Sequence, residues 1–296
     1  MKRARCLLLV VLLAWQLPLA ADPLLFRVEG EHGNAWLLGS VHTLRPSDYP
    51  LDERIEHAYA AAGHLVFEIA PQDFTGPAAA ITALELARFA DGRQLADVVD
   101  DETLQELAAL LRKYGTDAAQ MNGYEPWFVA MQLMNFTLLH HGYSPLHGVD
   151  LHFMTRAQKD GKRTSGLETV REQLGIFDAL PMERQLALLE QTIAESGNAG
   201  PELARLMRAW LDGDENTLAQ IADEEMQADP LLREALLVKR NRRWAAEIGR
   251  MLATEKGDVM LVVGALHLVG EDGLVTLLRE AGYEVRKVSG EEAPRK

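Results

Sequence analysis

Two similar glycine–histidine patterns follow apolar runs at opposite ends of the chain: GSVH at 39–42 and GALH at 264–267. Each run is typical of a buried strand, and the glycine lets the backbone turn or lets another group approach closely. A single GxxH is explained by a histidine that caps its strand by bonding a carbonyl. Two copies, each after a core-type strand, favour a shared site in which His42 and His267 meet.

Two glutamates occupy comparable places. Glu68 interrupts the apolar run LVFEIA, and Glu168 follows a short strand in SGLETVREQL. A buried carboxylate is costly unless it is paired or bound to a metal. The alternative for Glu168 is a carboxylate at a helix N-terminus, worth on the order of 0.3–1 kcal/mol. Together with His42 and His267, these residues form a mixed nitrogen and oxygen set suited to Zn²⁺, Mn²⁺ or Co²⁺.

A basic segment, KRNRRWAAEI, begins a helical stretch and contains Arg240 and Asn241. Its simplest interpretation is a solvated helix face. The functional interpretation is an arginine that pairs with a site carboxylate, or a donor that stabilises negative charge on a substrate carbonyl. Both interpretations stay open at this point.

Other histidines are weaker candidates. His147 and His152 lie near Asp150, but their spacing is not the i, i+4 spacing of a helix-borne metal pair. Asp150 is interpreted as a helix cap in preference to a site residue. His32, His57 and His64 are expected to be surface or turn residues.

The elements that must position these residues form a similar unit at each end of the chain. A turn signal, GEHGN, separates the first two strands and predicts a hairpin. The expected strands are 24–29, 35–41, 64–70, 162–168, 258–265 and 283–288, with helices at 51–63 and 271–282 beside them.

The middle of the chain is predicted to be mostly helical. The segment 125–141 is apolar almost all round, so we expect it to be buried. The fold class is therefore mixed α/β, with a central, mainly parallel sheet built from both chain ends and a helical insertion at about 75–160 and 181–254. Parallel sheets gather ligand-binding groups beyond the carboxyl ends of their strands, which is where the candidate residues fall.

The first 21 residues resemble a secretory signal peptide. A basic start, an apolar stretch and small residues predict cleavage near Ala20 or Ala21, and hence a secreted or periplasmic protein; an uncleaved anchor is the alternative. The only cysteine, Cys6, lies in this segment. Residues 22–296 are therefore expected to form a single domain without disulfides, cysteine nucleophiles or a membrane span.

Charge and missing motifs narrow the function. The net charge is −14, and losing the three positive charges of the leader makes it −17. Such a chain repels nucleic acid and anionic membranes. The sequence has no HExxH, GxSxG or P-loop motif, and no GxGxxG followed by a suitably placed acidic residue. A peptide or a small molecule is the expected substrate.

Several segments in a fixed order resemble the TraB/PrgY/GumN family, whose animal relatives are the Tiki metalloproteases of Wnt. These segments are LLGSVHTL, LVFEIA, EPWFVAMQL, GVDLHF, GLETVREQL, RNRRWAAEI and VVGALHLVGEDGLVTLLREAGYEV. The resemblance covers about residues 24–288 and suggests a GumN-type bacterial member. It implies a fold like that of erythromycin-esterase-like and ChaN-like proteins. Ser40 and Leu44 depart from the family pattern of threonine and glycine at those positions.

The resemblance implies a site made of the two GxxH histidines and the strand-end glutamates, with Arg240 and Asn241 beside it. The leading hypothesis is a metal-dependent peptidase. His42, His267 and one of Glu68 or Glu168 bind the metal, and the other glutamate is the general base. Two alternatives stay open: a metal-independent, esterase-like hydrolase with a histidine base, and a protein that binds peptides without cleaving them.

Overall fold

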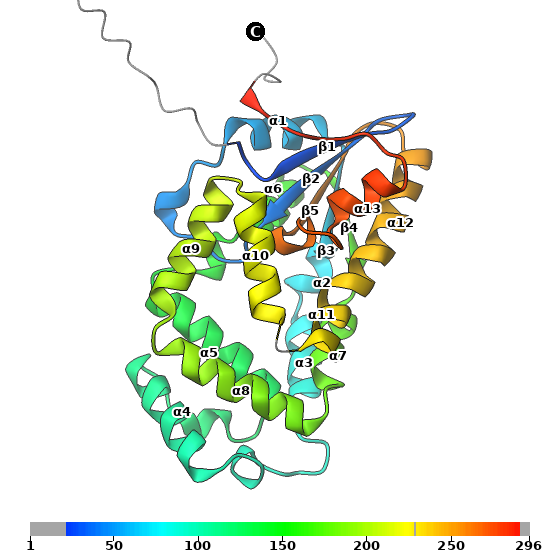
Figure 1. Ribbon diagram of the computed structural model, residues 1–296. Coiled ribbons are helices and arrows are strands. Elements are labelled where there is room, and N and C mark those ends of the chain that lie inside the picture. The colour runs from blue at the N-terminus through cyan, green and yellow to red at the C-terminus, as the bar shows by residue number, and fades with distance from the viewer. Residues whose placement is uncertain (1–21, 228, 291–296) are drawn as a thin grey trace, which may run out of the picture.

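A computed structural model describes residues 22–227 and 229–290 and shows a six-stranded mixed sheet surrounded by helices (Figure 1). The expected signal peptide lies outside the described residues. The strand order is β4-β3-β5-β2-β1-β6. The strands are β1 (Leu25–Glu29), β2 (Asn34–Ser40), β3 (His64–Ile69), β4 (Arg163–Glu168), β5 (Val259–Gly264) and β6 (Val285–Lys287).

The sheet is built from both ends of the chain, as predicted. β5 lies between β2 and β3 and is parallel to both, and β3 is parallel to β4. The hairpin partner β1 and the last strand β6 are antiparallel. This arrangement confirms a mixed α/β fold with a mainly parallel sheet. The likeness to erythromycin-esterase-like and ChaN-like folds stays a prediction.

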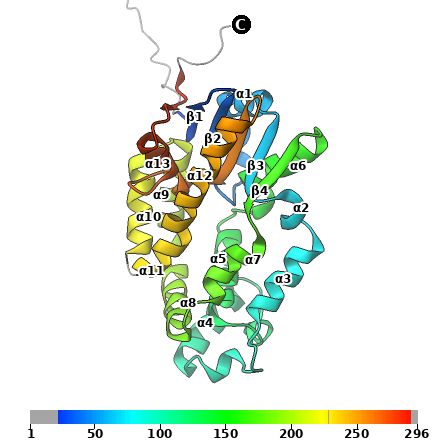
Figure 2. The same ribbon diagram turned by 90° about the vertical axis from the view of Figure 1, so that its right-hand side faces the viewer.

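Helices cover the sheet and extend well beyond its carboxyl edge (Figures 1 and 2). The helices before β4 are α1 (Glu53–Ala61), α2 (Pro71–Phe74), α3 (Pro77–Ala87), α4 (Asp101–Lys113), α5 (Pro126–His140) and α6 (Val149–Lys159). Those after it are α7 (Val170–Asp178), α8 (Met182–Ser196), α9 (Ala199–Leu211), α10 (Glu215–Met226), α11 (Pro230–Arg233), α12 (Lys239–Thr254) and α13 (Leu274–Glu280).

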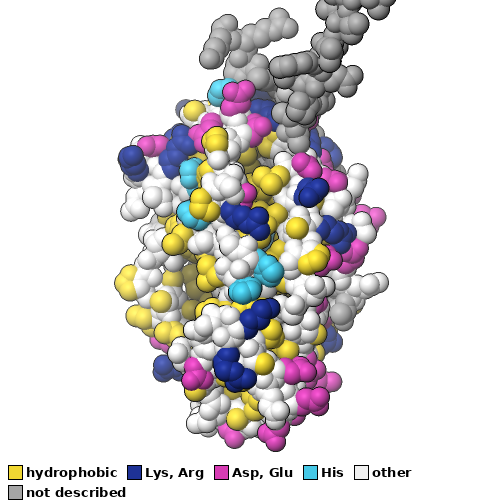
Figure 3. All heavy atoms as spheres, turned by 90° about the vertical axis from the view of Figure 1, so that its left-hand side faces the viewer, with side chains coloured by type: hydrophobic (Ala, Val, Ile, Leu, Met, Phe, Trp, Pro, Cys, Tyr) yellow, Lys and Arg dark blue, Asp and Glu magenta, His cyan; other side chains and the backbone are white. Residues whose placement is uncertain are grey.

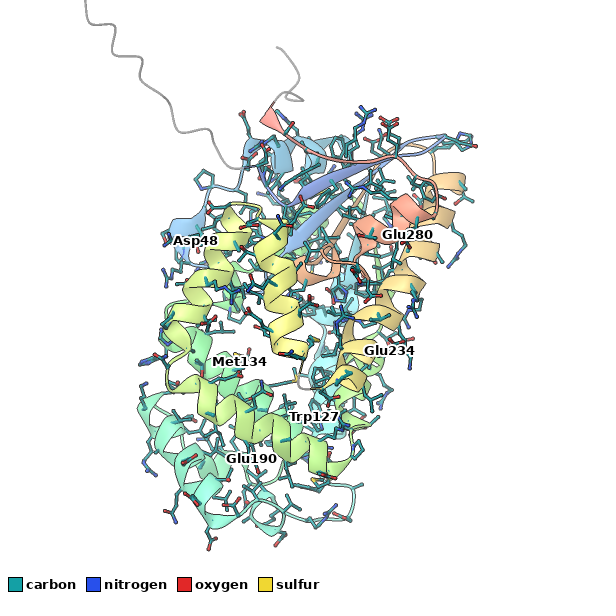
Figure 4. All side chains as sticks on the ribbon, in the orientation of Figure 1. Asp48, Trp127, Met134, Glu190, Glu234 and Glu280 are labelled. Carbon is teal, nitrogen blue, oxygen red and sulfur yellow. The ribbon has the colours of Figure 1, made fainter. Side chains whose placement is uncertain are left out.

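Two hydrophobic cores stabilise the molecule. The larger one surrounds the sheet, and the smaller one joins α4, α5 and α8 in the lower half of Figure 1. The helix α5 is less buried than its composition predicts, because Met134 and Leu139 are exposed although Trp127 is fully covered. Figure 4 places Trp127 and Met134 on this lower half. Figure 3 shows a hollow bordered by hydrophobic side chains on the side that faces left in Figure 1.

No helix among residues 22–227 and 229–290 combines the length and apolar character that a membrane crossing requires.

Candidate functional site

The two GxxH segments end at the same edge of the sheet. Ser40 is paired in register with Gly264, so β2 and β5 stop side by side. A Cβ atom on Gly264 would lie 3.5 Å from the Cδ2 atom of His267 and 3.9 Å from the Nε2 atom of His42. Both imidazole rings therefore border the space above this glycine, as the shared-site hypothesis requires.

Gly39, the glycine of the first GxxH segment, is also fixed by packing. A Cβ atom on Gly39 would lie 2.3 Å from the Cδ2 atom of Leu24 and 3.2 Å from the Cα atom of Ala265. In addition, the indole N–H of Trp210 on α9 donates to the Gly39 carbonyl over 2.8 Å. The end of β2 is thus packed closely against its neighbours, and this holds the loop that carries His42.

Glu68, near the end of β3, is buried and accepts three hydrogen bonds. Its Oε1 atom accepts from the Gly264 backbone N–H at 2.7 Å. Its Oε2 atom accepts from Gln173 at 2.8 Å and from Arg240 at 2.6 Å. Burial raises the pKa of Glu68, but attraction to His267, which is protonated only in the acidic range where Glu68 titrates, and to Arg240 and His42 outweighs burial and lowers that pKa to about 2. Glu68 is therefore a carboxylate, and it is a poor general base at neutral pH.

Arg240 on α12 lies between the two glutamates. Its Nη2 atom donates to Glu68 and, at 2.6 Å, to the Oε1 atom of Glu168; its Nε atom donates to the Oε2 atom of Glu168 at 3.1 Å. Its Nη1 atom donates to the Leu236 carbonyl at 2.8 Å and faces the Nε2 atom of His267 at 3.0 Å. A guanidinium has five N–H groups, and all five have acceptors here.

A π-helical turn, Glu234–Val238, precedes α12 and helps to place this arginine. π-Helical turns leave carbonyl groups outside the usual helical ladder and often occur at functional sites. Here the Leu236 carbonyl in this turn accepts from Arg240. Figure 4 shows Glu234, the first residue of the turn, beside the lower end of α12.

Glu168, at the end of β4, is covered by two arginines. Besides Arg240, the half-exposed Arg243 donates to its Oε2 atom at 2.8 Å. Burial, together with the nearby charge of Glu68, raises the pKa of Glu168, although both arginines oppose that shift. Both oxygens of Glu168 are thus engaged within the protein.

His267 is buried and neutral. Its Nδ1 atom lies 2.6 Å from the Oδ1 atom of Asn241, which can only accept, so we assign the proton to Nδ1. The Nε2 atom then presents its lone pair to Arg240, and the ring lies against Trp244 at a centroid distance of 4.5 Å. Burial is the main cause that lowers the pKa of His267, to about 3. Asn241 is held in turn by its own donation to the Asp272 carbonyl at 2.8 Å.

His42 differs from His267, because 67% of its side chain is exposed. Its Nδ1 atom lies 2.9 Å from the Oδ2 atom of Asp150, and the Oδ1 atom of Asp150 accepts from the buried Ser40 hydroxyl at 2.9 Å. Asp150 is the main cause that raises the pKa of His42, and solvent around the exposed ring weakens the attraction. Asp150 thus orients the imidazole through its Nδ1 atom, and the Nε2 atom is directed toward the space above Gly264.

Asp150 corrects one expectation from the sequence. It is not the cap of α6; Gly148 holds that position, without a side-chain bond. Asp150 instead reaches from the first turn of α6 to His42. Gln173 was also missed, because only the folded chain brings α7 against the end of β3. His147 and His152 line a separate groove along α6, whose lining includes neither Glu68 nor Arg240.

Two of the four residues expected to bind a metal already have partners within the protein. Arg240 and Arg243 engage both oxygens of Glu168, and Arg240 faces the free lone pair of His267. Only His42 Nε2 and Glu68 keep coordinating capacity toward the shared space, whereas a catalytic zinc site uses three protein ligands. Among the described residues, no group of three or more His, Asp, Glu or Cys side chains is arranged to hold a metal ion. In this arrangement the predicted set of two histidines and one glutamate does not fit a metal, because Arg240 faces the lone pair of His267.

Comparison with known proteins identifies the family. The TraB/PrgY/gumN family model matches residues 24–287, so the chain belongs to this family. YbaP of Escherichia coli, described as an uncharacterized protein, is 26% identical over 244 residues, which are 82% of this chain and 87% of YbaP.

More distant similarity connects the chain with animal proteins. Metalloprotease TIKI2 of Danio rerio is 25% identical over 170 residues, which are 49% of this chain and 33% of that protein. Metalloprotease TIKI2 of Xenopus tropicalis is 27% identical over 163 residues, 46% of this chain and 31% of that protein. No solved structure matches the chain.

Proposed function

We propose that the protein is a hydrolase of peptide bonds in which His42, oriented by Asp150, transfers the proton. The observation that carries this proposal is the exposed imidazole of His42, which lies beside the buried Glu68–Arg240–His267 cluster and whose Nδ1 atom is held at 2.9 Å from Asp150. The likeness to proteins named metalloproteases supports a peptide substrate. The leader at 1–21 supports a secreted or periplasmic location.

In the proposed reaction, His42 takes a proton from water and later gives the same proton to the leaving amine. Asp150 raises the pKa of His42 to about 9, so the unprotonated ring that can act as a base is the minor form at neutral pH, and kcat/KM is expected to rise with pH toward 9. In the unprotonated form, the Nε2 atom of His42 accepts a proton from water as the water oxygen bonds to the carbonyl carbon and the carbonyl electrons move onto oxygen. The same nitrogen then gives the proton to the amine nitrogen as the carbon–nitrogen bond breaks. Asp150 stabilises the intermediate imidazolium, and Ser40 fixes the orientation of Asp150.

The roles of the other site residues follow from their partners. Because every N–H group of Arg240 already has an acceptor, we assign Arg240 to holding Glu68 and Glu168, in place of the oxyanion role expected from the sequence. Asn241 fixes the tautomer of His267. The ionised Glu68 supplies negative charge near His42, which favours the protonated state of that histidine.

The names of the Tiki relatives favour a second candidate, a metal-dependent peptidase. In that case His42, His267 and one of Glu68 or Glu168 would hold Mn²⁺, Co²⁺ or Zn²⁺, and the other glutamate would be the general base. This would require Arg240 to move away from His267. The contacts of Arg240 argue against this candidate, and the relatives argue for it.

The test combines variants with metal control. The purified protein is incubated with a peptide library, and products are identified by mass spectrometry. We expect His42→Gln and Asp150→Asn each to lower kcat/KM by about 10²–10⁴-fold. The exposed His57→Gln is the matched control and is expected to change nothing.

Three outcomes separate the candidates. Activity that survives metal chelation and is lost in His42→Gln supports the proposed mechanism. Activity that is lost on chelation and restored by Mn²⁺, Co²⁺ or Zn²⁺ selects the metal-dependent candidate. Stoichiometric peptide binding without cleavage products selects a binding protein and refutes both enzymatic candidates.

A further inference from the structure

A groove of about 530 Å³ runs along α6, the helix that carries Asp150. Gly148, at the start of this helix, packs so closely against the loop of His42 that a Cβ atom would lie 2.2 Å from the His42 carbonyl oxygen. The Val149 N–H also donates to the Val41 carbonyl at 3.0 Å. The groove and the proton-transferring histidine are therefore parts of one rigid unit.

The near part of the groove is apolar and aromatic. The Tyr49 hydroxyl donates to the His147 carbonyl at 2.8 Å, which fixes the phenol ring, and that ring lies 5.2 Å from the ring of His152. Burial lowers the pKa of His152, so this ring is neutral at neutral pH. Leu146 is 77% exposed, more than any other large hydrophobic side chain in the described part of the chain, and Leu151 lies beside it on the helix.

The far part of the groove is cationic. Arg156 and Lys159 line it, and no carboxylate does so in the described part of the protein. Arg156 is paired with Glu56 and, at 3.8 Å, with Asp160, neither of which lines the groove. Lys159 is exposed and has no charged partner among the described residues. A free cation here stands out because the whole chain carries a net charge of −14.

We infer that this groove binds the substrate segment next to the cleaved bond and selects peptides with an apolar side chain followed by a carboxylate. This inference rests on the proposed function. The apolar side chain packs on Leu146 and Tyr49, and the carboxylate pairs with Lys159. The unpaired charge of Lys159, and the direct backbone contact between the start of α6 and the loop of His42, favour a peptide substrate as the occupant.

The helix sets the spacing of these two features. Asp150 and Lys159 are separated by nine positions in α6, which is roughly 13–14 Å along the helix axis at about 1.5 Å per residue. An extended peptide rises about 3.3 Å per residue and covers this length in about four residues. The carboxylate therefore lies about four residues from the cleaved bond, as an acidic side chain or as the end of the peptide.

The experiment uses fluorescent peptides that differ only in charge. Each carries an apolar residue near its centre and either Glu or Lys about four residues from the expected cleavage point, on the amino or the carboxyl side. A further pair has a free or an amidated carboxyl terminus, which distinguishes a side-chain carboxylate from a terminal one. Equilibrium binding is measured by fluorescence anisotropy, and cleavage is measured separately as kcat and KM.

Charge reversal is the decisive variant. Wild-type protein is expected to bind the Glu peptide about two- to fivefold more tightly than the Lys peptide, as an exposed ion pair allows. Lys159→Glu is expected to reverse that preference, whereas Lys113→Glu, a matched surface variant on α4, keeps it. Leu146→Ser is expected to weaken binding and raise KM about fivefold with little change in kcat. Leu231→Ser, at a leucine that is 68% exposed, is its control.

The experiment distinguishes an error in the proposed groove from an error in the proposed hydrolase function. A charge preference that Lys159→Glu leaves intact, or equal effects of Leu146→Ser and Leu231→Ser, overturns the groove even if peptides are cleaved. Binding that follows Lys159 without any cleavage supports the groove and refutes the hydrolase. Both variants lie on the surface, so circular dichroism of each provides a simple check of folding.

Discussion

Replacement of Arg240 by methionine tests whether a guanidinium holds the buried cluster together. Methionine has a similar length and no charge, so the substitution removes the donors while filling most of the volume. It leaves Glu68 without one of its three donors and Glu168 with only Arg243. We expect the free energy of unfolding at pH 7 to fall by about 3–5 kcal/mol, the usual cost of removing one partner from a buried ion pair.

Arg243→Met provides the matched control. Arg243 donates to the same carboxylate, but half of its side chain is exposed. Exposed ion pairs contribute about 0–1 kcal/mol, so this variant is expected to lose no more than that. Both values come from denaturant unfolding followed by circular dichroism.

The difference between wild type and Arg240→Met should depend on pH. In wild type, the pKa of Glu68 is lowered to about 2, so its stabilising contribution is complete above its unfolded pKa near 4.3–4.5 and is lost only as the pH falls toward 2. Without Arg240, burial raises the pKa of both glutamates, and protonation relieves the cost as the pH falls from 7 toward 4.5. The stability difference is therefore expected to shrink over that range. Equal losses in Arg240→Met and Arg243→Met, or a difference that does not vary with pH, would refute this account of the cluster.

Three further predictions concern other parts of the fold. His64 is buried, contrary to the surface or turn position expected from the sequence, and burial lowers its pKa. The contribution of His64 to stability should therefore be complete above about pH 6.5 and be lost below it. His64→Gln should flatten the dependence of the unfolding free energy on pH between 7 and 5. Gly39→Ala would place a methyl group 2.3 Å from Leu24 and should lower the unfolding free energy by about 1–3 kcal/mol, as denaturant titration can check. Gly264→Ala would place a methyl group 3.2 Å from the Oε1 atom of Glu68. We expect this variant to lower kcat while changing the free energy of unfolding little, with both quantities measured on the same preparation.

The sequence predicted the sheet well because its signals are local. Hydrophobic runs and turn residues marked the hairpin and the strands that became β3, β5 and β6, and crossover spacing indicated parallel pairing. The weak strand predicted at 162–168 became β4 (Arg163–Glu168). The exposed side chains of α5 were missed because the composition of a helix does not show how much of its surface the neighbouring helices cover.

The site was only partly predictable. Strand-end positions placed His42, His267, Glu68 and Glu168 at one edge of the sheet, and the structure puts all four strand ends there. The contacts among them depend on helices remote in sequence: Arg240 comes from α12, Gln173 from α7 and Asp150 from α6. Asp150 gave no distinct signal, since an aspartate in a first helical turn is a common stabilising feature.

The two GxxH segments also show why similar motifs do not imply identical chemistry. His42 and His267 follow paired strand ends, yet their protonation is pushed in opposite directions. An aspartate behind the exposed ring raises the pKa of His42, whereas burial beside the guanidinium of Arg240 lowers that of His267. One histidine is therefore suited to exchange protons with a substrate, and the other is suited to remain a neutral acceptor in the cluster. If the two rings had equivalent roles, His42→Gln and His267→Gln would have the same effect on kcat. We expect the first to lower turnover by about 10²–10⁴-fold and the second to act mainly through the stability of the Arg240 cluster.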